Sequence, residues 1–267
     1  MKKQFKLGII GCGFMATTIM RGVVLSDFIR EKKIIVSDKS EEKLDSVDYL
    51  GVKTTLDNKF VAENSEYLVL AVRPKSFEEV AKSIEGVRPE KVISVISGIS
   101  KSTIKNALGV GLIKVARCVP NMACSIGSGV IGIDMVDYNK NSADTEFITN
   151  VFNLLGTVVS LNEDKLDAVS ALSGNSVYPL VLIDSLVEAG EKIGLTKNEA
   201  KIFAVQSILG TAEMVQREEQ SIDELIMQTC NNGGTAIESV KVLEDSAFRK
   251  IVSDAVEACF DKMRDKK

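Results

Sequence analysis

Short apolar runs alternate with amphipathic segments along about the first 160 residues of the chain. The runs are rich in Val and Ile and lack polar alternation, which is typical of strands buried on both faces of a sheet. The predicted strands are Lys6–Ile10, Lys33–Ser37, Tyr67–Val72, Val92–Ser97, Ile113–Cys118 and Val158–Leu161. Strands and helices that alternate at this spacing predict a parallel, doubly wound sheet.

Capping residues delimit the helices between these strands. Ser76 followed by Glu79 predicts a capping box. Ser100 predicts the start of a short helix that Gly109 ends. A helical apolar stripe from Phe147 to Leu155, closed by Gly156, predicts another.

After Leu161 the strand signals stop, and about 105 remaining residues predict helices. Val177–Val187 is apolar on nearly every side, which is typical of a helix that is buried all round. Further stripes over 202–215 and 248–263 add apolar surface that one small bundle does not easily hide. We therefore expect a homodimer or a multiple of dimers, with packing against the first domain alone as the alternative.

The first predicted strand runs directly into a glycine-rich turn, Gly11-Cys12-Gly13-Phe14-Met15-Ala16. Gly-x-Gly-x-x-Ala between a strand and a helix is the turn that holds a dinucleotide pyrophosphate. Gly11 permits the tight turn, Gly13 lets the backbone approach phosphate, and Ala16 lets the helix pack on the strand. A Gly-rich turn of another α/β domain is the alternative. We expect a Rossmann-type dinucleotide-binding domain over 1–161 and an all-α dimerisation and substrate domain over 162–267.

The second strand ends in both acidic and basic residues. An acid at this point favours NAD, whereas hydroxyl and basic groups favour NADP. Ser37, Lys39 and Ser40 suit a 2′-phosphate, and Asp38 either opposes it or caps the turn. We expect NADP(H) to be preferred, with NAD(H) possible.

The composition of the chain excludes several classes of function. The chain has no His, which rules out Ser–His and Cys–His nucleophilic sites and His-based metal sites, and no ligand spacing indicates a metal. A net charge of −4 provides no basic face for nucleic acid. No apolar run approaches the ~20 residues that span a bilayer, and the chain meets its first strand at once, so we expect neither a membrane span nor a signal peptide. Five scattered cysteines indicate a reducing, cytoplasmic location.

Glycine and proline residues mark four further candidate ligand sites. Ala71-Val72-Arg73-Pro74, Ser97-Gly98-Ile99 and Arg117-Cys118-Val119-Pro120-Asn121 each end a predicted strand. Strand ends of a doubly wound sheet face the ligand crevice, although simple strand punctuation is the alternative. In the helical half, Gly233-Gly234-Thr235 precedes a helix, where backbone N–H groups can approach a carboxylate. A plain connector between helices is the alternative there.

These segments, in this order, resemble the pyrroline-5-carboxylate reductase family over nearly the whole chain. Gly8-x-x-Gly11-x-Gly13-x-Met15-Ala16 is similar to the family's N-terminal fingerprint, and Asn58 matches an asparagine that touches the cofactor. The three strand ends above are similar to the family's Ala-Val-Lys-Pro, Ala-Gly-Ile and Arg-x-Met-Pro-Asn. The cofactor-binding residues predicted from the strand ends and this resemblance are Gly11, Gly13, Phe14, Met15, Ala16, Ser37, Lys39, Asn58, Ala71, Val72, Arg73, Pro74, Ser97, Gly98 and Asn121.

The helical half carries the resemblance further. The segment 167–174 matches the entry to the family's long dimer helix, and Glu188-Ala189-Gly190 and Gly194-Leu195 follow as in the family. The resemblance implies a helical domain that interlocks with a second subunit, with the substrate between the nicotinamide and the dimer helices. It implies hydride transfer from NADPH to the C=N bond of 1-pyrroline-5-carboxylate, which gives L-proline. The Gly-Gly-Thr turn would hold the substrate carboxylate through backbone N–H groups.

Two departures from the family pattern lie in the expected substrate site. Ala236 replaces the family's second threonine, and the loop over 173–179 is one residue shorter than the family's Ser-Gly-Ser-Gly-Pro-Ala-Tyr. The substrate-binding residues that we predict are Ser173, Gly233, Gly234, Thr235 and Ala236, with Thr235 positioning the substrate. The alternatives are a reductase of another small cyclic imine acid and a non-catalytic NADP(H)-binding paralogue. A β-hydroxyacid dehydrogenase would need a lysine that Val169–Tyr178 lacks.

Overall fold

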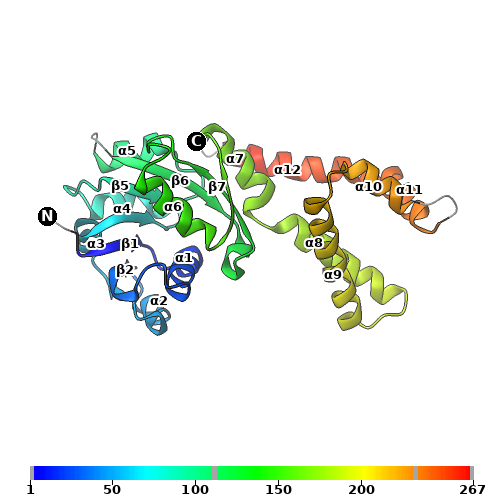
Figure 1. Ribbon diagram of the computed structural model, residues 1–267, viewed down its shortest axis with the longest axis horizontal. Coiled ribbons are helices and arrows are strands. Elements are labelled where there is room, and N and C mark those ends of the chain that lie inside the picture. Colours follow the sequence, from blue (N-terminus) through cyan, green and yellow to red (C-terminus); the bar gives the residue numbers. More distant parts are fainter. Residues whose placement is uncertain (1–2, 110–112, 231–233, 265–267) are drawn as a thin grey trace. The chain divides into compact units, whose positions relative to one another are not determined.

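The computed structural model describes residues 3–109, 113–230 and 234–264, and its ribbon is shown in Figure 1. Compactness divides the chain into two units. The sheet unit comprises residues 1–175 with 260–267, and the helical unit comprises residues 176–259. The last strand ends at Ser160. The predicted domain boundary after residue 161 therefore marks the end of the sheet rather than that of the compact unit.

One sheet of eight strands, in the order β3-β2-β1-β4-β5-β6-β7-β8, forms the sheet unit. Its strands are β1 Phe5–Ile10, β2 Ile34–Ser37, β3 Lys53–Thr55, β4 Ser65–Leu70, β5 Lys91–Ser94, β6 Lys114–Pro120, β7 Gly129–Asp134 and β8 Gly156–Ser160. All neighbouring pairs among these described strands are parallel except β6 and β7, which run antiparallel. The order of the first six strands is that of a dinucleotide-binding Rossmann sheet.

Two of these strands, β3 and β7, were not predicted, and the antiparallel β6–β7 pair corrects the expectation of a wholly parallel sheet. β3 has three polar residues, one exposed and two half-buried, and no apolar run. β7 begins at Gly129 and contains Gly132, and these glycines dilute its strand signal. A Cβ atom at Gly132 would lie 2.9 Å from Val169 Cγ1, so this glycine lets the chain around Val169 pack closely on the strand.

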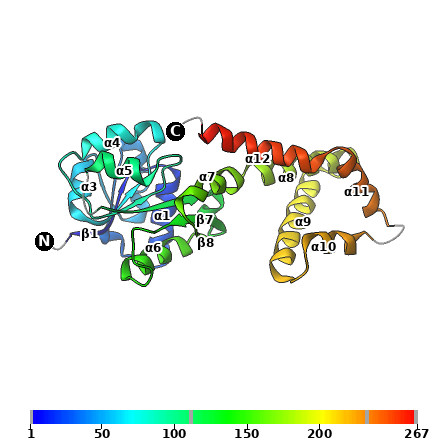
Figure 2. The ribbon, with the colours of Figure 1, turned by 90° about the horizontal axis from the view of Figure 1, so that it is seen from above.

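Helices cover both faces of the sheet (Figures 1 and 2). They are α1 Phe14–Leu25, α2 Glu41–Asp45, α3 Asn58–Asn64, α4 Phe77–Ser83, α5 Lys101–Leu108, α6 Ala143–Asn153 and α7 Leu166–Val169. One apolar cluster joins β1 to α1 and α6, with Ile19 and Phe152 fully buried in it. A second cluster joins the other face to α3, α4 and α5, through Val61, Phe77 and Ile104. The doubly wound prediction is therefore confirmed.

The predicted capping box at Ser76 does not form. Pro74–Ser76 is a 3-10 turn that runs straight into α4, and Ser76 has helical dihedral angles (φ −98°, ψ −3°). A capping residue needs an extended backbone to aim its side chain at the first turn. The cap predicted at Ser100 is present, because its side chain accepts a hydrogen bond from the Thr103 N–H and α5 ends before Gly109.

The helical unit is built from α8 Val177–Lys192, α9 Lys197–Arg217, α10 Ile222–Thr229, α11 Ala236–Asp245 and α12 Phe248–Arg264, which continues past residue 259. Capping boxes at Thr196 and Ser221 start α9 and α10. The small core of the helical unit lies between α8 and α9, where Val187, Ala200 and Ala204 are buried. A Cβ atom at Gly190 would lie 2.7 Å from Ala200 Cβ, so the two helices pack closely there.

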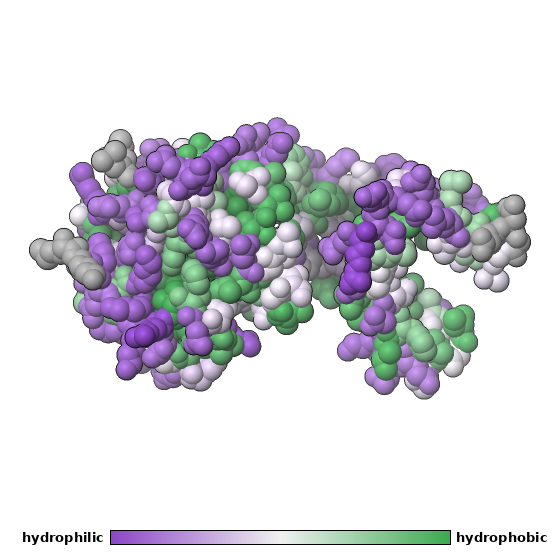
Figure 3. All heavy atoms as spheres, in the orientation of Figure 1, coloured by the Kyte–Doolittle hydropathy of each residue, from purple (hydrophilic) through white to green (hydrophobic). Residues whose placement is uncertain are grey.

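The apolar residues of α8 are mostly exposed within a single chain. Leu180 is 58 % and Val181 59 % exposed, and hydrophobic residues reach the surface of the helical unit in Figure 3. The prediction that this helix is buried all round is therefore not met by one copy of the chain. The stretch Glu163–Lys192, which contains α7 and α8, is long and apolar enough to cross a membrane by length and composition, which corrects the expectation that no such run exists. A single stretch of this kind is weak evidence for a span, because a covered helix of a non-membrane protein passes the same test.

Candidate cofactor and substrate site

Gly11 holds the turn between β1 and α1 for structural reasons. Its φ is +98°, and a Cβ atom there would lie 2.6 Å from the Ala71 carbonyl oxygen. Its N–H donates to the Ser37 carbonyl oxygen at 2.7 Å. Both the left-handed backbone and the close contact with Ala71 require glycine. Gly11 thus ties β1 to the ends of its two neighbours, β2 and β4.

Gly13 has no such structural reason to be glycine. Its φ is −93°, which any residue adopts, and no heavy atom of the described residues lies within 4 Å of the position of a Cβ atom. No side chain caps α1 in the described part of the chain, and its first turn holds no acidic residue. Open space before an uncapped helix N-terminus suits an anion, because N–H groups and the helix dipole point there. The residues present therefore fit the pyrophosphate of a dinucleotide.

Asp38 points back to this turn. Its side chain is 10 % exposed, and its two oxygens accept hydrogen bonds from the Cys12 N–H at 2.8 Å and the Ser40 N–H at 3.0 Å. The Lys43 ammonium lies 3.6 Å from the same carboxylate. Of the two roles that the sequence leaves open for Asp38, these bonds show the cap of a turn.

Two predicted cofactor residues, Ser37 and Asn58, bond to each other. The Ser37 hydroxyl is fully buried and donates to Asn58 Oδ1 at 2.7 Å. Asn58 Nδ2 donates in turn to Ser83 Oγ at 2.9 Å. Lys39, by contrast, is exposed and lies 3.4 Å from Glu79. Lys39 is therefore accessible to a ligand from solvent, whereas the Ser37 side chain is buried.

The sheet brings the other predicted cofactor segments to one edge. β1, β4 and β5 are adjacent and parallel, so the glycine turn, the segment 71–74 and the segment 97–98 all follow carboxyl ends of neighbouring strands. Arg73, Pro74 and Ser97 are exposed there, and Gly98 has a φ of +72°. Asn121 lies after β6, where its Oδ1 accepts a hydrogen bond from the Val130 N–H at 3.2 Å.

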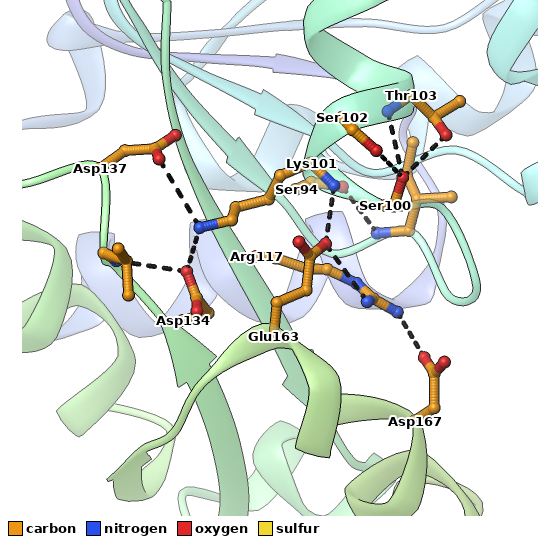
Figure 4. A network of polar contacts seen from close by, with 12 residues as sticks. Ser94, Ser100, Lys101, Ser102, Thr103, Arg117, Asp134, Asp137, Glu163 and Asp167 are labelled. Atoms are coloured by element: carbon orange, nitrogen blue, oxygen red, sulfur yellow. Dashed lines mark hydrogen bonds and ion pairs between the residues drawn. The ribbon is translucent and has the colours of Figure 1, made fainter.

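A buried network of charges beside this edge was not predicted from the sequence (Figure 4). Arg117 on β6 is 2 % exposed, and its Nη2 lies 2.7 Å from Asp167 Oδ1. Its Nη1 lies 3.4 Å from Glu163 Oε1, the oxygen that also accepts a hydrogen bond from the Lys101 N–H at 2.7 Å. Among the described residues, Arg117 Nε has no hydrogen-bond partner. The network joins the start of α5, strand β6 and the chain that leads into α7.

The same network continues to the far end of β7. The Lys101 ammonium pairs with Asp134, which is 1 % exposed, and the Lys105 ammonium lies 2.7 Å from Asp137. Burial alone would raise the pKa of Asp137, but hydrogen bonds from Lys105 and from the Val115 N–H outweigh it and lower that pKa. The Asp137 carboxylate therefore stays ionised at neutral pH. No linear motif reveals such pairs, because their members are tens of residues apart.

Cys12 is not a nucleophile in this site. Burial, reinforced by the Asp38 carboxylate, raises the pKa of its thiol, so the thiol stays protonated at neutral pH. The thiol donates instead to the Lys43 carbonyl oxygen at 3.3 Å. The cysteine therefore belongs to the support of the glycine turn.

The predicted substrate residues belong to both units. Ser173 lies in a π-turn of the sheet unit, where its hydroxyl donates to the Val169 carbonyl oxygen at 3.0 Å. Gly234, Thr235 and Ala236 lie at the start of α11 in the helical unit, and Gly233 lies outside the described residues. Thr235 is exposed, and its hydroxyl makes no capping bond within the described residues.

The sheet order and the glycine turn place the protein in the class of dinucleotide-binding Rossmann proteins. Residues 6–98 match the family described as NADP oxidoreductase coenzyme F420-dependent, and residues 163–266 match pyrroline-5-carboxylate reductase dimerisation. A pyrroline-5-carboxylate reductase of Synechocystis sp. is 30 % identical over 263 residues, which is 96 % of each chain. The enzyme of that name from Escherichia coli is 28 % identical over the same length.

Solved structures agree with these relatives. The structure of a pyrroline-5-carboxylate reductase from Coxiella burnetii superimposes with a TM-score of 0.85 at 30 % identity and covers 98 % of each chain. A Plasmodium falciparum pyrroline carboxylate reductase with NADP bound has a TM-score of 0.85 at 26 % identity, over 97 % of this chain and 98 % of that one. The chain belongs to the pyrroline-5-carboxylate reductase family.

Proposed function

We propose that this protein transfers a hydride from NADPH to the C=N bond of 1-pyrroline-5-carboxylate and forms L-proline. The observation that carries the proposal is Gly13, a glycine that neither backbone nor packing requires, at the uncapped start of α1. Membership of the family, and NADP in the Plasmodium falciparum structure, support this choice of reaction and cofactor. NADH is the possible substitute for NADPH.

On the cofactor side, the glycine turn and the first turn of α1 hold the pyrophosphate through backbone N–H groups. The segments 71–74 and 97–98 and Asn121 supply further contacts along the sheet edge. NADPH, when bound, supplies the hydride; the chain binds and orients it. The charge network around Arg117 keeps the start of α5, and hence the loop that carries Gly98, in a fixed place.

On the substrate side, the backbone N–H groups of Gly234 and Thr235, at the N-terminus of α11, hold the substrate carboxylate. The Thr235 hydroxyl, which makes no capping bond within the described residues, positions the ring. A cyclic imine protonates readily in water, and the resulting iminium accepts a hydride without a strong protein acid. A chain without His is adequate for this chemistry.

The working form is a homodimer or a multiple of it, in the cytoplasm. The match of residues 163–266 to the family's dimerisation model and the exposed apolar side chains of α8 support this assembly. A second copy of the chain is the cover that these side chains lack. The small-molecule substrate is the remaining partner.

Two measurements test this function. Purified protein should oxidise NADPH when 1-pyrroline-5-carboxylate is added, with proline formed in equal amount. A protein that binds NADPH and leaves this imine unreduced would refute the proposed substrate. In calorimetry, Gly13→Val should abolish NADPH binding, because its side chain fills the space for the pyrophosphate. Gly210→Val is the matched control, since Gly210 on α9 also faces open space. Equal NADPH affinity in both variants would overturn the role of the turn.

A further inference from the structure

Asp38 directly follows β2, the position at which Rossmann proteins carry the acidic residue that hydrogen-bonds the adenosine ribose. In this chain both of its oxygens are already engaged by backbone N–H groups, those of Cys12 and Ser40. The side chain is 10 % exposed, so little of it faces solvent. A ribose hydroxyl would have to reach a carboxylate that is 10 % exposed and that two backbone N–H groups already hold.

Three bonds join the glycine turn to the last residue of β2 and to the residues that follow it. The Gly11 N–H donates to the Ser37 carbonyl oxygen, the Cys12 N–H to Asp38, and the Cys12 thiol to the Lys43 carbonyl oxygen. Of these three bonds, the one to Asp38 has a charged acceptor. It holds the N–H of Cys12, the residue between Gly11 and Gly13. Bonds of this kind to an ionised acceptor are stronger than neutral ones. Asp38 therefore fixes the part of the turn that must approach phosphate.

We propose that Asp38 is a positioning residue of the pyrophosphate turn and does not discriminate between NADPH and NADH. The discrimination falls on the cation beside it, the exposed Lys39, whose partner Glu79 lies 3.4 Å away. Lys39 is one of the residues that the sequence already suggests for the 2′-phosphate of NADPH, which NADH lacks. This inference rests on the proposed nucleotide-dependent function and assigns separate tasks to two neighbouring residues.

The two roles that Asp38 can have predict opposite changes in affinity. If Asp38 binds the adenosine ribose, its carboxylate bonds the 2′-hydroxyl of NADH and repels the 2′-phosphate of NADPH. Asp38→Asn would then strengthen NADPH binding and weaken NADH binding. As a positioning residue, it supports the pyrophosphate turn that both nucleotides share. Both affinities then fall by the same factor, and their ratio stays unchanged.

The test is calorimetric titration of the full-length protein and of Asp38→Asn, Asp38→Ala and Lys39→Gln with NADPH and with NADH. Asn keeps one acceptor oxygen and Ala keeps none, so the loss should be graded, about 10- to 150-fold for each lost bond to the ionised carboxylate. The NADPH-to-NADH affinity ratio should stay within about twofold of the wild type in both Asp38 variants. Lys39→Gln, the matched control, should lower NADPH affinity alone.

A second readout needs no nucleotide. In Asp38→Asn, amide hydrogen exchange at Cys12 and Gly13 should accelerate relative to the wild type, while exchange across β1 and β4 stays unchanged. An NADPH-to-NADH affinity ratio that rises more than tenfold in Asp38→Asn would overturn the positioning role. So would unchanged amide hydrogen exchange at Cys12 in that variant. A wild-type protein that binds neither nucleotide would instead refute the proposed function, and the exchange measurement would still decide the role of Asp38.

Discussion

The sheet unit and the helical unit treat their apolar residues differently. In the sheet unit, two clusters of fully buried side chains cover both faces of the sheet. In the helical unit, the cluster between α8 and α9 has three buried members, Val187, Ala200 and Ala204. Larger side chains of the same helices, such as Leu180 and Phe203, stay more than half exposed. The sheet unit thus buries its apolar side chains within one chain. The helical unit leaves most of its large apolar side chains exposed.

This difference shows what each unit needs in order to work. The sheet unit has the buried surface to fold as one chain and to present the glycine turn ready for a nucleotide. The helical unit exposes apolar surface of the kind that marks an interaction site. We infer that binding of the cofactor is a property of each chain, whereas reduction of the imine is a property of the assembly.

The largest expected effect comes from the ion pair between Arg117 and Asp167, which are 2 % and 5 % exposed. Asp167→Ala removes the nearer carboxylate and leaves the buried guanidinium with Glu163, 3.4 Å from its Nη1, so we expect the free energy of unfolding to fall by about 3–5 kcal/mol. Urea unfolding at fixed protein concentration measures this loss.

The matched control lies in α12. The Lys250–Asp254 pair has side chains that are 72 % and 57 % exposed. Asp254→Ala should therefore change stability by less than about 1 kcal/mol. Similar losses in the two variants would contradict the view that buried charges organise the sheet unit.

A smaller effect should follow from acid. Burial alone would raise the pKa of Asp144, but hydrogen bonds from Lys91 and Tyr67 outweigh it and lower that pKa. A carboxyl whose folded pKa is depressed contributes stability above its unfolded pKa and loses it as the pH falls through the folded pKa. Asp144→Asn should therefore be less stable than the wild type at neutral pH, with the difference vanishing in acid. Thermal melting between neutral and strongly acidic pH measures this, and a difference that does not change with pH would exclude the linkage.

The smallest expected effect lies on the substrate side. Ala236 stands where the family has a threonine, and one missing hydrogen bond is worth about 0.5–1.5 kcal/mol. Ala236→Thr should raise kcat/KM for 1-pyrroline-5-carboxylate by about 2- to 13-fold and leave NADPH affinity unchanged. A variant no better than its parent would indicate that the site is shaped for another imine acid.

Strands and the glycine turn were predictable because their signals are local. Val and Ile runs marked six strands, and the spacing of Gly11, Gly13 and Ala16 marked the phosphate turn. β7 was not predicted because Gly132 breaks its apolar run. This glycine is needed for close contact with Val169, which is distant in the sequence. The partners of Arg117 are 46 and 50 residues away in the chain, so their contact depends on the sheet order and not on any motif.

The direction of the Asp38 side chain likewise needed the structure. The sequence left open whether this residue opposes a phosphate or caps a turn, because both require an acid after a strand. The hydrogen bond from the Cys12 N–H shows that it faces the turn. The exposed face of α8 could be anticipated as an interface from composition alone, but which residues stay uncovered depends on its packing with α9.

The central claim is that each chain binds NADPH by itself and that reduction needs a second copy. Leu180→Glu tests it most directly, because it places a charge on the exposed face of α8, where Leu180 is 58 % exposed. Leu25→Glu, at a leucine of the sheet unit that is 70 % exposed, is the matched control. We expect light scattering to report twice the 29.0 kDa chain mass, or a multiple of that, for the wild type and for the control, and a single chain for Leu180→Glu. The single-chain variant should bind NADPH with unchanged affinity and reduce no 1-pyrroline-5-carboxylate. A monomeric variant that still forms proline, or one that is well folded and no longer binds NADPH, would contradict the account.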